Sequence, residues 1–344
     1  MNLTIMVPTK NRPNFISRQL KYYSASSFKG HIFIGDSSNQ KLFNETKSNI
    51  LKYGLNLNIQ HFHIPKLTAA KATSFLSCKV TTDYSVSLAD DDIIFTKSIS
   101  KCLDFLNQNH DYVGVHGSTY LMELKGKEAK PIGKILKLMD YHLAIRTEDN
   151  SISRIEMFSE DIRNIDMIII RSRENMVAFN LIDNLTDYFS SYVMGELVHG
   201  TVVASRGKIG KIDVSYGIRQ NHTEQYYLTL NYSEWFSNKD WQDSCKFLKS
   251  IIEKEIMMNH KMEIDVVNDK SSVILSNFLK TVKVDSISSK KKLSVIEYVY
   301  KTLNDFFYTK YTTFIYKNKI LFSKQDDDMH LYCSIVTKDL SIVS

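Results

Sequence analysis

The hydrophobic and polar positions in the first part of the chain follow two patterns: short apolar runs, and stretches with helical spacing. Residues 3–7 form an apolar run that ends at Pro8, which is typical of a buried strand. Residues 31–34 form a second such run, which ends at Gly35-Asp36-Ser37-Ser38. Between the two runs, apolar residues recur at the i, i+4 and i+7 positions of a helix, namely Ile16, Leu20 and Tyr23.

The same alternation continues to residue 115. Residues 55–64 alternate between apolar and polar side chains and predict a strand, with Leu55, Leu57, Ile59 and Phe62 as the core candidates. Two further strands are predicted at 84–88 and 112–115, with a helix between them from the apolar positions Ile99, Cys102, Leu103 and Leu106. Strands that alternate with helices over short connections indicate an α/β fold, in which a parallel-type sheet is covered by helices on both faces. Sheets of this kind bind ligands at the carboxyl ends of their strands.

The pattern changes near Ile218. The four prolines lie in the first half of the chain and the last glycine is Gly217, so residues 218–344 contain neither. Apolar residues keep helical spacing in two places of this region: Trp241, Cys245, Leu248 and Ile252, then Leu293, Ile296, Tyr300, Leu303 and Phe307. We therefore predict an α/β domain in residues 1–226 and a mainly helical region in residues 227–344.

The composition is that of a folded soluble protein. The 344 residues are 43% hydrophobic and 24% charged, which excludes global disorder. Four widely spaced cysteines form no Cys-x-x-Cys pair, so we expect reduced thiols and no zinc site. Residues 1–12 do not have the form of a signal peptide, and the apolar runs are too short to cross a bilayer, so we expect a cytoplasmic location.

Three adjacent aspartates, Asp90, Asp91 and Asp92, follow the strand predicted at 84–88. Neighbouring carboxylates beside apolar residues do not all ionise without a counter-charge, and a divalent cation such as Mn²⁺ or Mg²⁺ supplies one through hard oxygen ligands. The alternative is a cluster that caps a helix N-terminus. The same tripeptide at 326–328 has no strand before it, and we expect a solvated turn there.

Two other polar loops follow predicted strands. The segment 8–13 carries Thr9, Asn11 and Arg12, which suit a nucleotide because a hydroxyl and an amide hydrogen-bond to it while the cation approaches phosphate. Asp36 ends the second strand, where a carboxylate can accept a hydrogen bond from a ribose hydroxyl or a base N–H. Taken singly, the first loop is compatible with an ordinary turn, and the second with a common Asp-Ser-Ser loop.

In their order and spacing, these segments resemble the GT-A nucleotide-sugar glycosyltransferases: Val-Pro-Thr-Lys-Asn-Arg-Pro at 7–13, Gly-Asp-Ser-Ser at 35–38 and Ala-Asp-Asp-Asp at 89–92. The nearest type is the family-2-like bacterial enzymes that build capsule, lipopolysaccharide and O-antigen chains. The resemblance covers roughly residues 1–226. It implies a Rossmann-like GT-A fold with a helical C-terminal extension, a divalent metal held by DxD-type aspartates, and a nucleotide-sugar donor.

The resemblance also implies roles for single residues in donor binding. Asp36 matches the residue that contacts the base or ribose, Asp90 matches the ribose-facing aspartate, and Asp91 or Asp92 matches the metal ligand. Lys71 sits where the family often has a basic residue that faces the diphosphate, although the usual preceding Gly and following Asn are absent.

The acceptor half resembles the family less closely. Glu196, in a predicted helix start, is the expected catalytic base, which takes a proton from the acceptor hydroxyl if transfer inverts the anomeric centre. The usual Glu-Asp pair is missing there, so Asp187 is the second candidate and Glu160-Asp161 the third. The alternative for Glu196 is an exposed helix acid.

A last strand is predicted at 212–214, with residues 218–222 as its exit loop. Several GT-A enzymes place a histidine there as a third metal ligand, and His222 fits by position. Arg219 is expected to help neutralise the leaving diphosphate. The alternative for His222 is an ordinary surface histidine.

The net charge is +6, and residues 280–324 account for the excess because they hold ten lysines against three acids. Aromatic residues are interleaved with lysines at 298–316, which suits a helix lying on an anionic membrane. The sequence leaves three roles open for this region: packing against the α/β domain, a homo-oligomer interface, and peripheral membrane contact through 285–324. Nucleic-acid binding also fits basic–aromatic interleaving, but the carboxylate-rich loops argue against it.

Together these features predict a metal-dependent glycosyltransferase, which moves a sugar from a nucleotide-sugar donor to a growing bacterial surface glycan or lipid-linked acceptor. The expected place of action is the inner face of the cytoplasmic membrane. One alternative is a non-catalytic, glycan-binding assembly subunit, and another is a sugar-phosphate nucleotidyltransferase. The last of these needs a Gly-rich loop after the first strand, and residues 8–13 contain no glycine.

Overall fold

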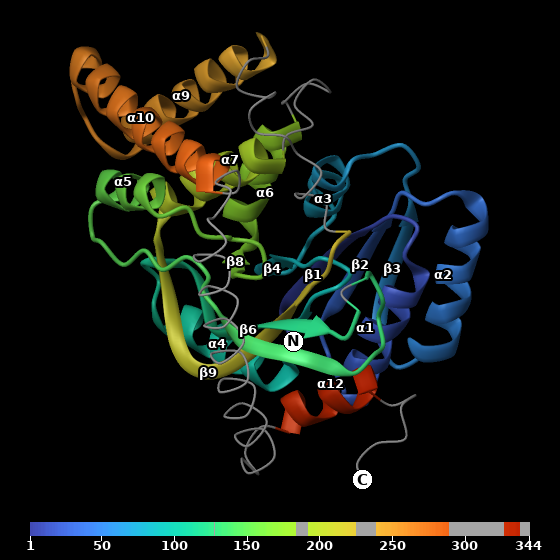
Figure 1. Cartoon of the computed structure of the whole chain (residues 1–344). Helices are drawn as coiled ribbons and strands as arrows, with labels where there is room; N and C mark the ends of the chain where they lie inside the picture. The colour runs from blue at the N-terminus through green and yellow to red at the C-terminus, as the bar shows by residue number, and fades with distance from the viewer. Residues whose placement is uncertain (127, 184–191, 225–238, 289–326, 338–344) are drawn as a thin grey trace, which may run out of the picture.

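The computed structural model describes residues 1–126, 128–183, 192–224, 239–288 and 327–337. Nine strands within these ranges form one central sheet in the order β3-β2-β1-β4-β8-β6-β9-β5, with β7 paired to β6. Helices lie on both sides of the sheet, with α3, α6 and α7 on one side and α1, α4 and α12 on the other (Figure 1). The predicted α/β fold is confirmed.

The first four strands are parallel, as predicted: β1 (Leu3–Thr9), β2 (His31–Asp36), β3 (Asn58–His63) and β4 (Tyr84–Ser87). They are connected by α1 (Pro13–Ala25), α2 (Gln40–Tyr53) and α3 (Ala69–Ser77). The register aligns Thr9 with Asp36 and Asp36 with His63, so the carboxyl ends of three strands lie together at one edge of the sheet.

Local sequence sets where these helices begin. Pro13 is the first residue of α1, a position that tolerates its missing N–H and its fixed φ. Asn39 caps α2 and Thr68 caps α3, and each side chain accepts a backbone N–H of the first helical turn. The helices therefore start directly after the polar loops that end β1, β2 and β3.

The strand predicted at 55–64 is shorter than expected. α2 extends to a C-cap at Gly54, β3 begins only at Asn58, and Leu55 between them is 78% exposed. The prediction that Leu55 lies in the core is therefore wrong. Leu55 belongs to the turn before β3, although its spacing from Leu57 and Ile59 matches that of a strand. The other three candidates, Leu57, Ile59 and Phe62, pack against the core as predicted.

The second half of the sheet is mixed. Its strands are β5 (Ile93–Ile94), β6 (Tyr112–Leu124), β7 (Ile135–Tyr141), β8 (Ile169–Arg171) and β9 (Lys208–Asn221). β6 and β9 are parallel, but β8 runs antiparallel to β4 and β6, and β5 and β7 also pair antiparallel with their neighbours. The predicted parallel-type sheet is correct only for the first half, because an apolar run does not encode the direction of its strand.

β9 continues through Asn221, so the exit loop predicted from Ile218 is wrong for every residue except His222. Gly217 is not a loop glycine. A Cβ at this position would lie 2.4 Å from the carbonyl oxygen of Ile93, so the glycine lets β5 approach β9 closely. Arg219 consequently lies within a strand and not in a loop.

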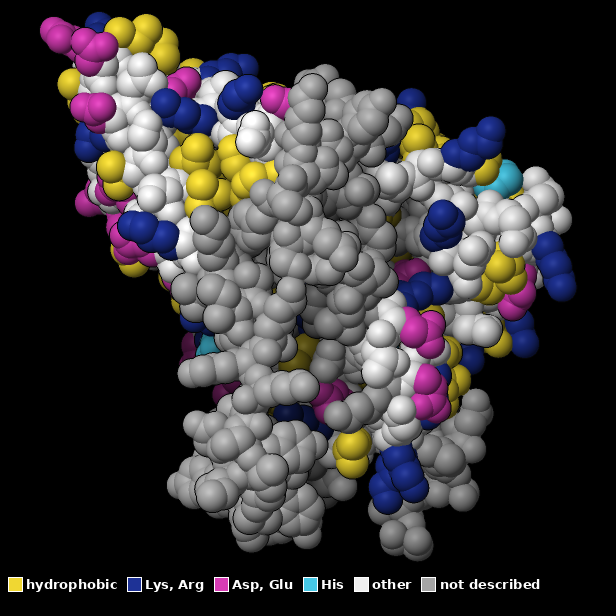
Figure 2. Space-filling view, turned by 45° about the horizontal axis from the view of Figure 1, so that its top comes forward, with side chains coloured by type: hydrophobic (Ala, Val, Ile, Leu, Met, Phe, Trp, Pro, Cys, Tyr) yellow, Lys and Arg dark blue, Asp and Glu magenta, His cyan; other side chains and the backbone are white. Residues whose placement is uncertain are grey.

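The remaining helices are α4 (Thr96–Gln108), α5 (Ser151–Glu160), α6 (Ser172–Asp183), α7 (Tyr192–Arg206), α9 (Lys239–Asn259), α10 (Ile264–Ser288) and α12 (Asp327–Thr337). α9 and α10 form a hairpin that packs against α5 and α7, which confirms the helix predicted around 241–252. Figure 2 shows hydrophobic side chains among charged ones on this hairpin, where Met257, Met258 and Ile264 are exposed. The helix predicted around 293–307 lies outside the described residues.

None of the described helices is long and apolar enough to pass through a bilayer. The aromatic and basic segment expected to contact a membrane, 285–324, falls outside the described residues from 289 onward. Membrane contact by that segment stays a prediction.

α12 returns to the α/β part and packs against α1. Its first turn carries two of the three aspartates for which a solvated turn was predicted, and that prediction is wrong. Asp328 is buried and accepts the backbone N–H of Lys97 at 2.8 Å, while Asp327 lies 2.5 Å from the Lys97 Nζ atom. Acids in the first turn of a helix interact favourably with its dipole, so Asp327 and Asp328 begin a helix.

Candidate active site

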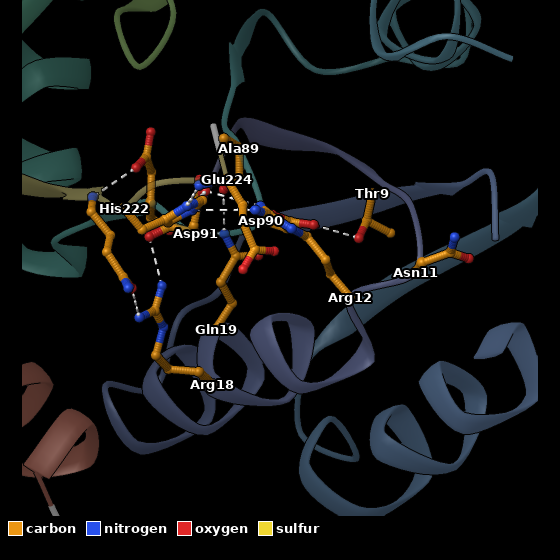
Figure 3. Close-up of polar contacts among 12 residues, drawn as sticks. Thr9, Asn11, Arg12, Arg18, Gln19, Ala89, Asp90, Asp91, His222 and Glu224 are labelled. Atoms are coloured by element: carbon orange, nitrogen blue, oxygen red, sulfur yellow. Dashed lines mark hydrogen bonds and ion pairs between the residues drawn. The ribbon is translucent and has the colours of Figure 1, made fainter. Parts of the chain in front are cut away.

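The loop after β1 faces the aspartate loop after β4. The hydroxyl of Thr9 donates to Oδ2 of Asp90 at 2.6 Å. Asn11 adopts a left-handed conformation with φ 59°, and its backbone N–H donates to the hydroxyl of Ser38 at 2.7 Å. The Asn11 side chain points away from the aspartates (Figure 3). Of the three residues predicted in this loop, Thr9 and Arg12 therefore reach the aspartates and Asn11 does not.

Arg12, two aspartates and His222 form one compact cluster (Figure 3). The Nη1 atom of Arg12 lies 2.8 Å from Oδ1 of Asp90 and 2.9 Å from Oδ2 of Asp91. The same Asp91 oxygen lies 2.8 Å from Nε2 of His222, which in turn lies 3.2 Å from Nη2 of Arg12. The structure thus brings together Asp91 and His222, two of the three predicted metal ligands, from positions 131 residues apart.

The three aspartates are all buried and differ in their proton affinity. Burial raises the pKa of Asp91, but the hydrogen bond with His222 and the charge of Arg12 outweigh it and lower the pKa to about 2. Burial and the charge of Asp91 raise the pKa of Asp90 to about 6, against the opposing charge of Arg12. Burial and the charge of Asp91 also raise the pKa of Asp92 well above its ordinary value. Asp91 is therefore the most acidic of the three carboxyl groups.

Asp92 points to a different partner from the other two aspartates. Its Oδ1 atom accepts the backbone N–H of Gln220 at 3.1 Å. The backbone of the loop is held from below by α1, because the Gln19 side chain donates to the carbonyl oxygens of Ala89 and Asp92, each at 2.8 Å. The loop therefore presents Asp90 and Asp91 to Arg12 and turns Asp92 toward β9.

Asp36 is fully buried at the end of β2. Its Oδ1 atom accepts the backbone N–H of Ser38 at 2.9 Å, and Oδ2 lies 3.2 Å from Nε2 of His61. Burial raises the pKa of Asp36, but the hydrogen bonds from His61 and Ser38 outweigh it and lower the pKa. The carboxylate is thus held ionised at the sheet edge, and its contact with a base or ribose stays a prediction.

Three aromatic rings beside Asp36 were not predicted as site residues. The Phe43 ring stacks on His61 at a centroid distance of 4.4 Å and on His63 at 4.1 Å. His63 Nε2 also lies 3.0 Å from the carbonyl oxygen of Ser38. The sequence contained a signal for this group, since His61 and His63 alternate on the strand predicted at 55–64 and so share one face.

The two other predicted phosphate contacts lie at different places around the cluster. Lys71 occupies the first turn of α3, where its backbone N–H donates to the Thr68 hydroxyl at 3.3 Å. Arg219 projects from β9, and its Nη1 atom donates to the Tyr141 hydroxyl at 3.0 Å with the guanidinium 5.2 Å from the ring centroid. The Thr68 hydroxyl and the Tyr141 hydroxyl both lie outside the Arg12 cluster.

Glu196 lies in the first half of α7, half-buried, with Oε1 3.4 Å from Nδ2 of Asn164. Burial raises the pKa of Tyr141, the charge of Arg219 opposes this shift, and the charges of Glu196, Asp92 and Asp166 add to it. Glu196 and Asp166 therefore lie on the Tyr141 side of the site, within electrostatic reach of the aspartate loop.

Asp166 was not predicted as a site residue. It precedes Met167, a non-glycine residue with φ 74°, whose backbone N–H donates to the carbonyl oxygen of Ser87 at 2.9 Å. Backbone strain of this kind clusters at functional sites. This position carries no local sequence signal, because a left-handed methionine is not recognisable from its neighbours.

The other candidates for the base are Glu160, Asp161 and Asp187. The first two lie at the end of α5, and Asp187 lies outside the described residues. Glu160 ends α5, and Asp161 follows as its C-cap with Oδ1 2.7 Å from Nε of Arg163. The Asp161 carboxylate is thus in a surface ion pair, half-exposed.

Asp91 and His222 have the ligand types that suit Mn²⁺ or Mg²⁺, a carboxylate oxygen and an imidazole nitrogen. The described residues contain no group of three His, Cys, Asp or Glu side chains that would enclose a metal ion. Nδ1 of His222 accepts the backbone N–H of Glu224 at 3.2 Å, so coordination by Nε2 would require the other tautomer. Of the described residues, Asp91 and His222 would hold such a cation, and oxygen atoms of a bound ligand would have to complete its coordination.

No family model and no curated protein matches the sequence. The structure, however, is similar to S. aureus TarS. Residues 1–349 of TarS in complex with UDP-GlcNAc align with a TM-score of 0.53 and 14% identity, over 85% of this chain and 77% of that one. TarS 1–349 alone aligns with a TM-score of 0.50 and 14% identity, over 98% of this chain and 90% of the TarS chain. A longer TarS structure aligns with a TM-score of 0.50 and 13% identity. The alignment covers 86% of this chain and 46% of the TarS chain, so this chain spans about half of it. The chain therefore has the GT-A-like α/β fold that its sequence predicted.

Proposed function

We propose that the protein is a glycosyltransferase that uses a nucleotide-sugar donor. The observation that carries this proposal is the meeting of two groups at one sheet edge: the buried Asp36 with its rings, and the cluster of Arg12, Asp90, Asp91 and His222. The first group suits a nucleoside and the second suits a diphosphate. A similarly folded protein, TarS, binds UDP-GlcNAc, which supports the same class of donor here.

The nucleoside end of the donor is assigned to the Asp36 side of the edge. The ionised carboxylate would accept from a base N–H or a ribose hydroxyl, with His61 holding it in place. Phe43 and the two histidines offer flat surfaces for the base, and stacking of a base on an aromatic ring is worth about 1–3 kcal/mol. Asp90, oriented by the Thr9 hydroxyl, would face the ribose.

The diphosphate is assigned to the Arg12 side. Asp91 and His222 would hold Mn²⁺ or Mg²⁺, which supplies positive charge against the leaving nucleoside diphosphate when bound. Arg12 would turn from Asp91 to the phosphate oxygens, since its guanidinium forms strong bidentate contacts with phosphate. Arg219 and Lys71 would add positive charge around the same group.

Acceptor chemistry is assigned to the Tyr141 side, where Glu196 would act as the base. In an inverting transfer, Glu196 takes the proton of the acceptor hydroxyl while the hydroxyl oxygen bonds to the anomeric carbon. The bond from that carbon to the diphosphate breaks, and its electron pair leaves with the diphosphate. Asp166 is the neighbouring carboxylate and the alternative base.

The proposed acceptor is a bacterial surface glycan or a lipid-linked intermediate at the inner face of the cytoplasmic membrane. The basic and aromatic composition of 285–324 supports contact with an anionic membrane. We further propose that residues 1–226 form the catalytic domain and that the region from 227 onward serves packing, homo-oligomer formation or membrane docking.

The deciding experiment is a donor screen in Mn²⁺ with UDP-, GDP-, CMP- and TDP-sugars, with nucleotide release as the measurement. We expect release from at least one donor and a fall of about 100-fold or more in Asp91→Asn, because the leaving group loses its charge partner. The matched control is Asp104→Asn, an exposed acid on α4, which should keep full activity.

The absence of release from every donor, together with unchanged donor binding in Asp91→Asn, would refute the enzyme proposal. Binding of a UDP-sugar without release in any acceptor extract would favour the non-catalytic glycan-assembly alternative. Calorimetric titration with the same donors separates these two outcomes, because it measures binding without turnover.

A further inference from the structure

Arg18, on α1, is a buried cation beneath the aspartate loop. Its Nη2 atom donates to the carbonyl oxygen of Asp91 at 2.6 Å, and Nη1 donates to the carbonyl oxygen of Pro131 at 3.1 Å. Nη1 also donates to Oε1 of Gln220, while Nε makes no hydrogen bond among the described residues. These hydrogen-bond partners are all neutral oxygen atoms, and the nearby charge of Arg18 acts on the buried Asp92, where it opposes the rise in pKa that burial and Asp91 cause. Burying a cation is unfavourable unless its charge is compensated.

Through these bonds Arg18 connects the two segments that carry the proposed metal ligands. Asp91 itself is one ligand, and Gln220 lies two positions before His222 on the same strand end. The backbone N–H of Gln220 also donates to Asp92, so the loop and the strand are joined on both sides of Arg18. One side chain of α1 therefore fixes the spacing between residues that are 131 positions apart in the chain.

Two aromatic rings lie beside the Arg18 guanidinium. Its Cζ atom is 5.1 Å from the centroid of Phe15 and 5.6 Å from the centroid of Tyr332. Both distances are within the range of a cation–π interaction, which is worth about 2 kcal/mol when the pair is desolvated. Phe15 also lies 6.1 Å from the His222 ring.

Tyr332 belongs to α12, far from the rest of the site in sequence. It is fully buried, and its ring packs edge-on against Tyr22 at a centroid distance of 5.7 Å. Its hydroxyl has no hydrogen-bond partner among the described residues. The ring, and not the hydroxyl, is therefore the part of Tyr332 that serves the site. α12 is held in register by the bond from the Lys97 N–H to Asp328.

We propose that Arg18 and Tyr332 are positioning residues for the divalent cation. The Tyr332 ring stabilises the buried Arg18, and Arg18 keeps the segments of Asp91 and His222 close enough for both side chains to bind the same ion. This inference rests on the proposed function, since it assumes that these two residues bind the metal. It assigns α12 a role in catalysis although none of its residues reaches the donor edge.

The experiment compares full-length Tyr332→Leu with Tyr332→Phe, and measures Mn²⁺ binding in the presence of UDP by electron paramagnetic resonance. Tyr332→Phe keeps the ring and should bind Mn²⁺ like the wild type. Tyr332→Leu should weaken Mn²⁺ binding about three- to tenfold, because the cation–π contribution is lost. Arg18→Lys keeps the charge but cannot bridge both segments, and should weaken Mn²⁺ binding at least as much.

Ile335→Ala is the matched control, because Ile335 is buried on the same helix. It should lower the melting temperature as Tyr332→Leu does, yet leave Mn²⁺ binding unchanged. Equal Mn²⁺ affinities in Tyr332→Leu and Tyr332→Phe, or an equal loss in Ile335→Ala, would overturn the inference. A wild type that binds UDP but no Mn²⁺ would overturn the metal assignment itself, and this inference with it.

Discussion

The Nη1 atom of Arg12 lies 2.9 Å from Oδ2 of Asp91, the same oxygen that His222 contacts. A cationic side chain therefore stands beside the carboxylate that is proposed to bind the metal. The charge of Arg12 lowers the pKa of Asp91 and keeps it ionised, but it also repels a second cation. Binding of the metal and movement of Arg12 to the phosphates are thus expected to occur together.

Replacing Arg12 should separate these two effects. Without nucleotide, Arg12→Gln should bind Mn²⁺ about tenfold more tightly, a change of ~1.4 kcal/mol, because the competing charge is gone. Its affinity for a nucleotide-sugar should fall about 10- to 100-fold, since hydrogen bonds to charged groups contribute about 1.5–3 kcal/mol. Calorimetric titrations with Mn²⁺ and with UDP measure the two changes. Lys10→Gln, a change at an exposed neighbour, is the control, and a uniform loss of both affinities would contradict the prediction.

Removing the charge of Asp92 should stabilise the protein at neutral pH. Burial and Asp91 raise the pKa of Asp92 in the folded protein, so between the ordinary pKa near 3.8 and the folded value the folded state binds more protons than the unfolded state. Stability is therefore lost as the pH rises through this range. Asp92→Asn should raise the free energy of unfolding at pH 7 by on the order of 1 kcal/mol or more, since each pKa unit corresponds to about 1.4 kcal/mol.

Urea denaturation at pH 4 and pH 7 tests the Asp92 prediction. The gain of Asp92→Asn over wild type should be large at pH 7 and nearly absent at pH 4. Asp104→Asn, at an exposed acid, should show no such dependence. A gain that is equal at both pH values would show that the charge of Asp92 is not its origin.

The nucleoside site should be separable from the phosphate site. Phe43→Leu removes the ring that stacks on both histidines, and should weaken UDP binding by about 1–3 kcal/mol, or about 5- to 100-fold. Binding of pyrophosphate with Mn²⁺ should not change, because it does not involve the base. Competition titrations with UDP and pyrophosphate measure the difference. A parallel loss for both ligands would place Phe43 in a structural role only.

The assignment of the base rests on a comparison of two carboxylates. Glu196→Gln should lower kcat for transfer about 100- to 10,000-fold and leave donor affinity unchanged, as expected for the loss of a general base. Asp166→Asn should have a much smaller effect. Single-turnover transfer and UDP titration give the two quantities. The reverse order of effects would move the role of base to Asp166.

The parts of the site that follow a strand directly could be predicted from the sequence. A polar loop after an apolar run lies at the carboxyl edge of a parallel sheet, and this located Thr9, Arg12, Asp36 and the three aspartates. The resemblance to GT-A enzymes implied roles for the same residues. His222 was predicted from the resemblance to GT-A enzymes, which implied a metal-binding histidine at this position.

The contacts that join distant segments could not be predicted. Arg18 and Gln220 have ordinary helix and strand neighbours, and only the folded chain shows that they bond to each other and to the aspartate loop. The sequence showed Gly217 only as the last glycine of the chain, whereas in the structure it permits the close approach of β5 to β9. The prediction of a parallel-type sheet failed in the second half because burial selects apolar residues whichever way a strand runs, and β8 was not predicted as a strand at all.

The position of α12 sets the order in which the site can assemble during synthesis. Every proposed donor and metal residue precedes residue 223, yet the ring beside Arg18 comes from residue 332. A chain that ends before α12 would lack Tyr332, and the guanidinium of Arg18 would lose one of its two neighbouring rings. The proposed role of Tyr332 therefore implies that the site is completed only after the residues of α9 and α10 have been synthesised.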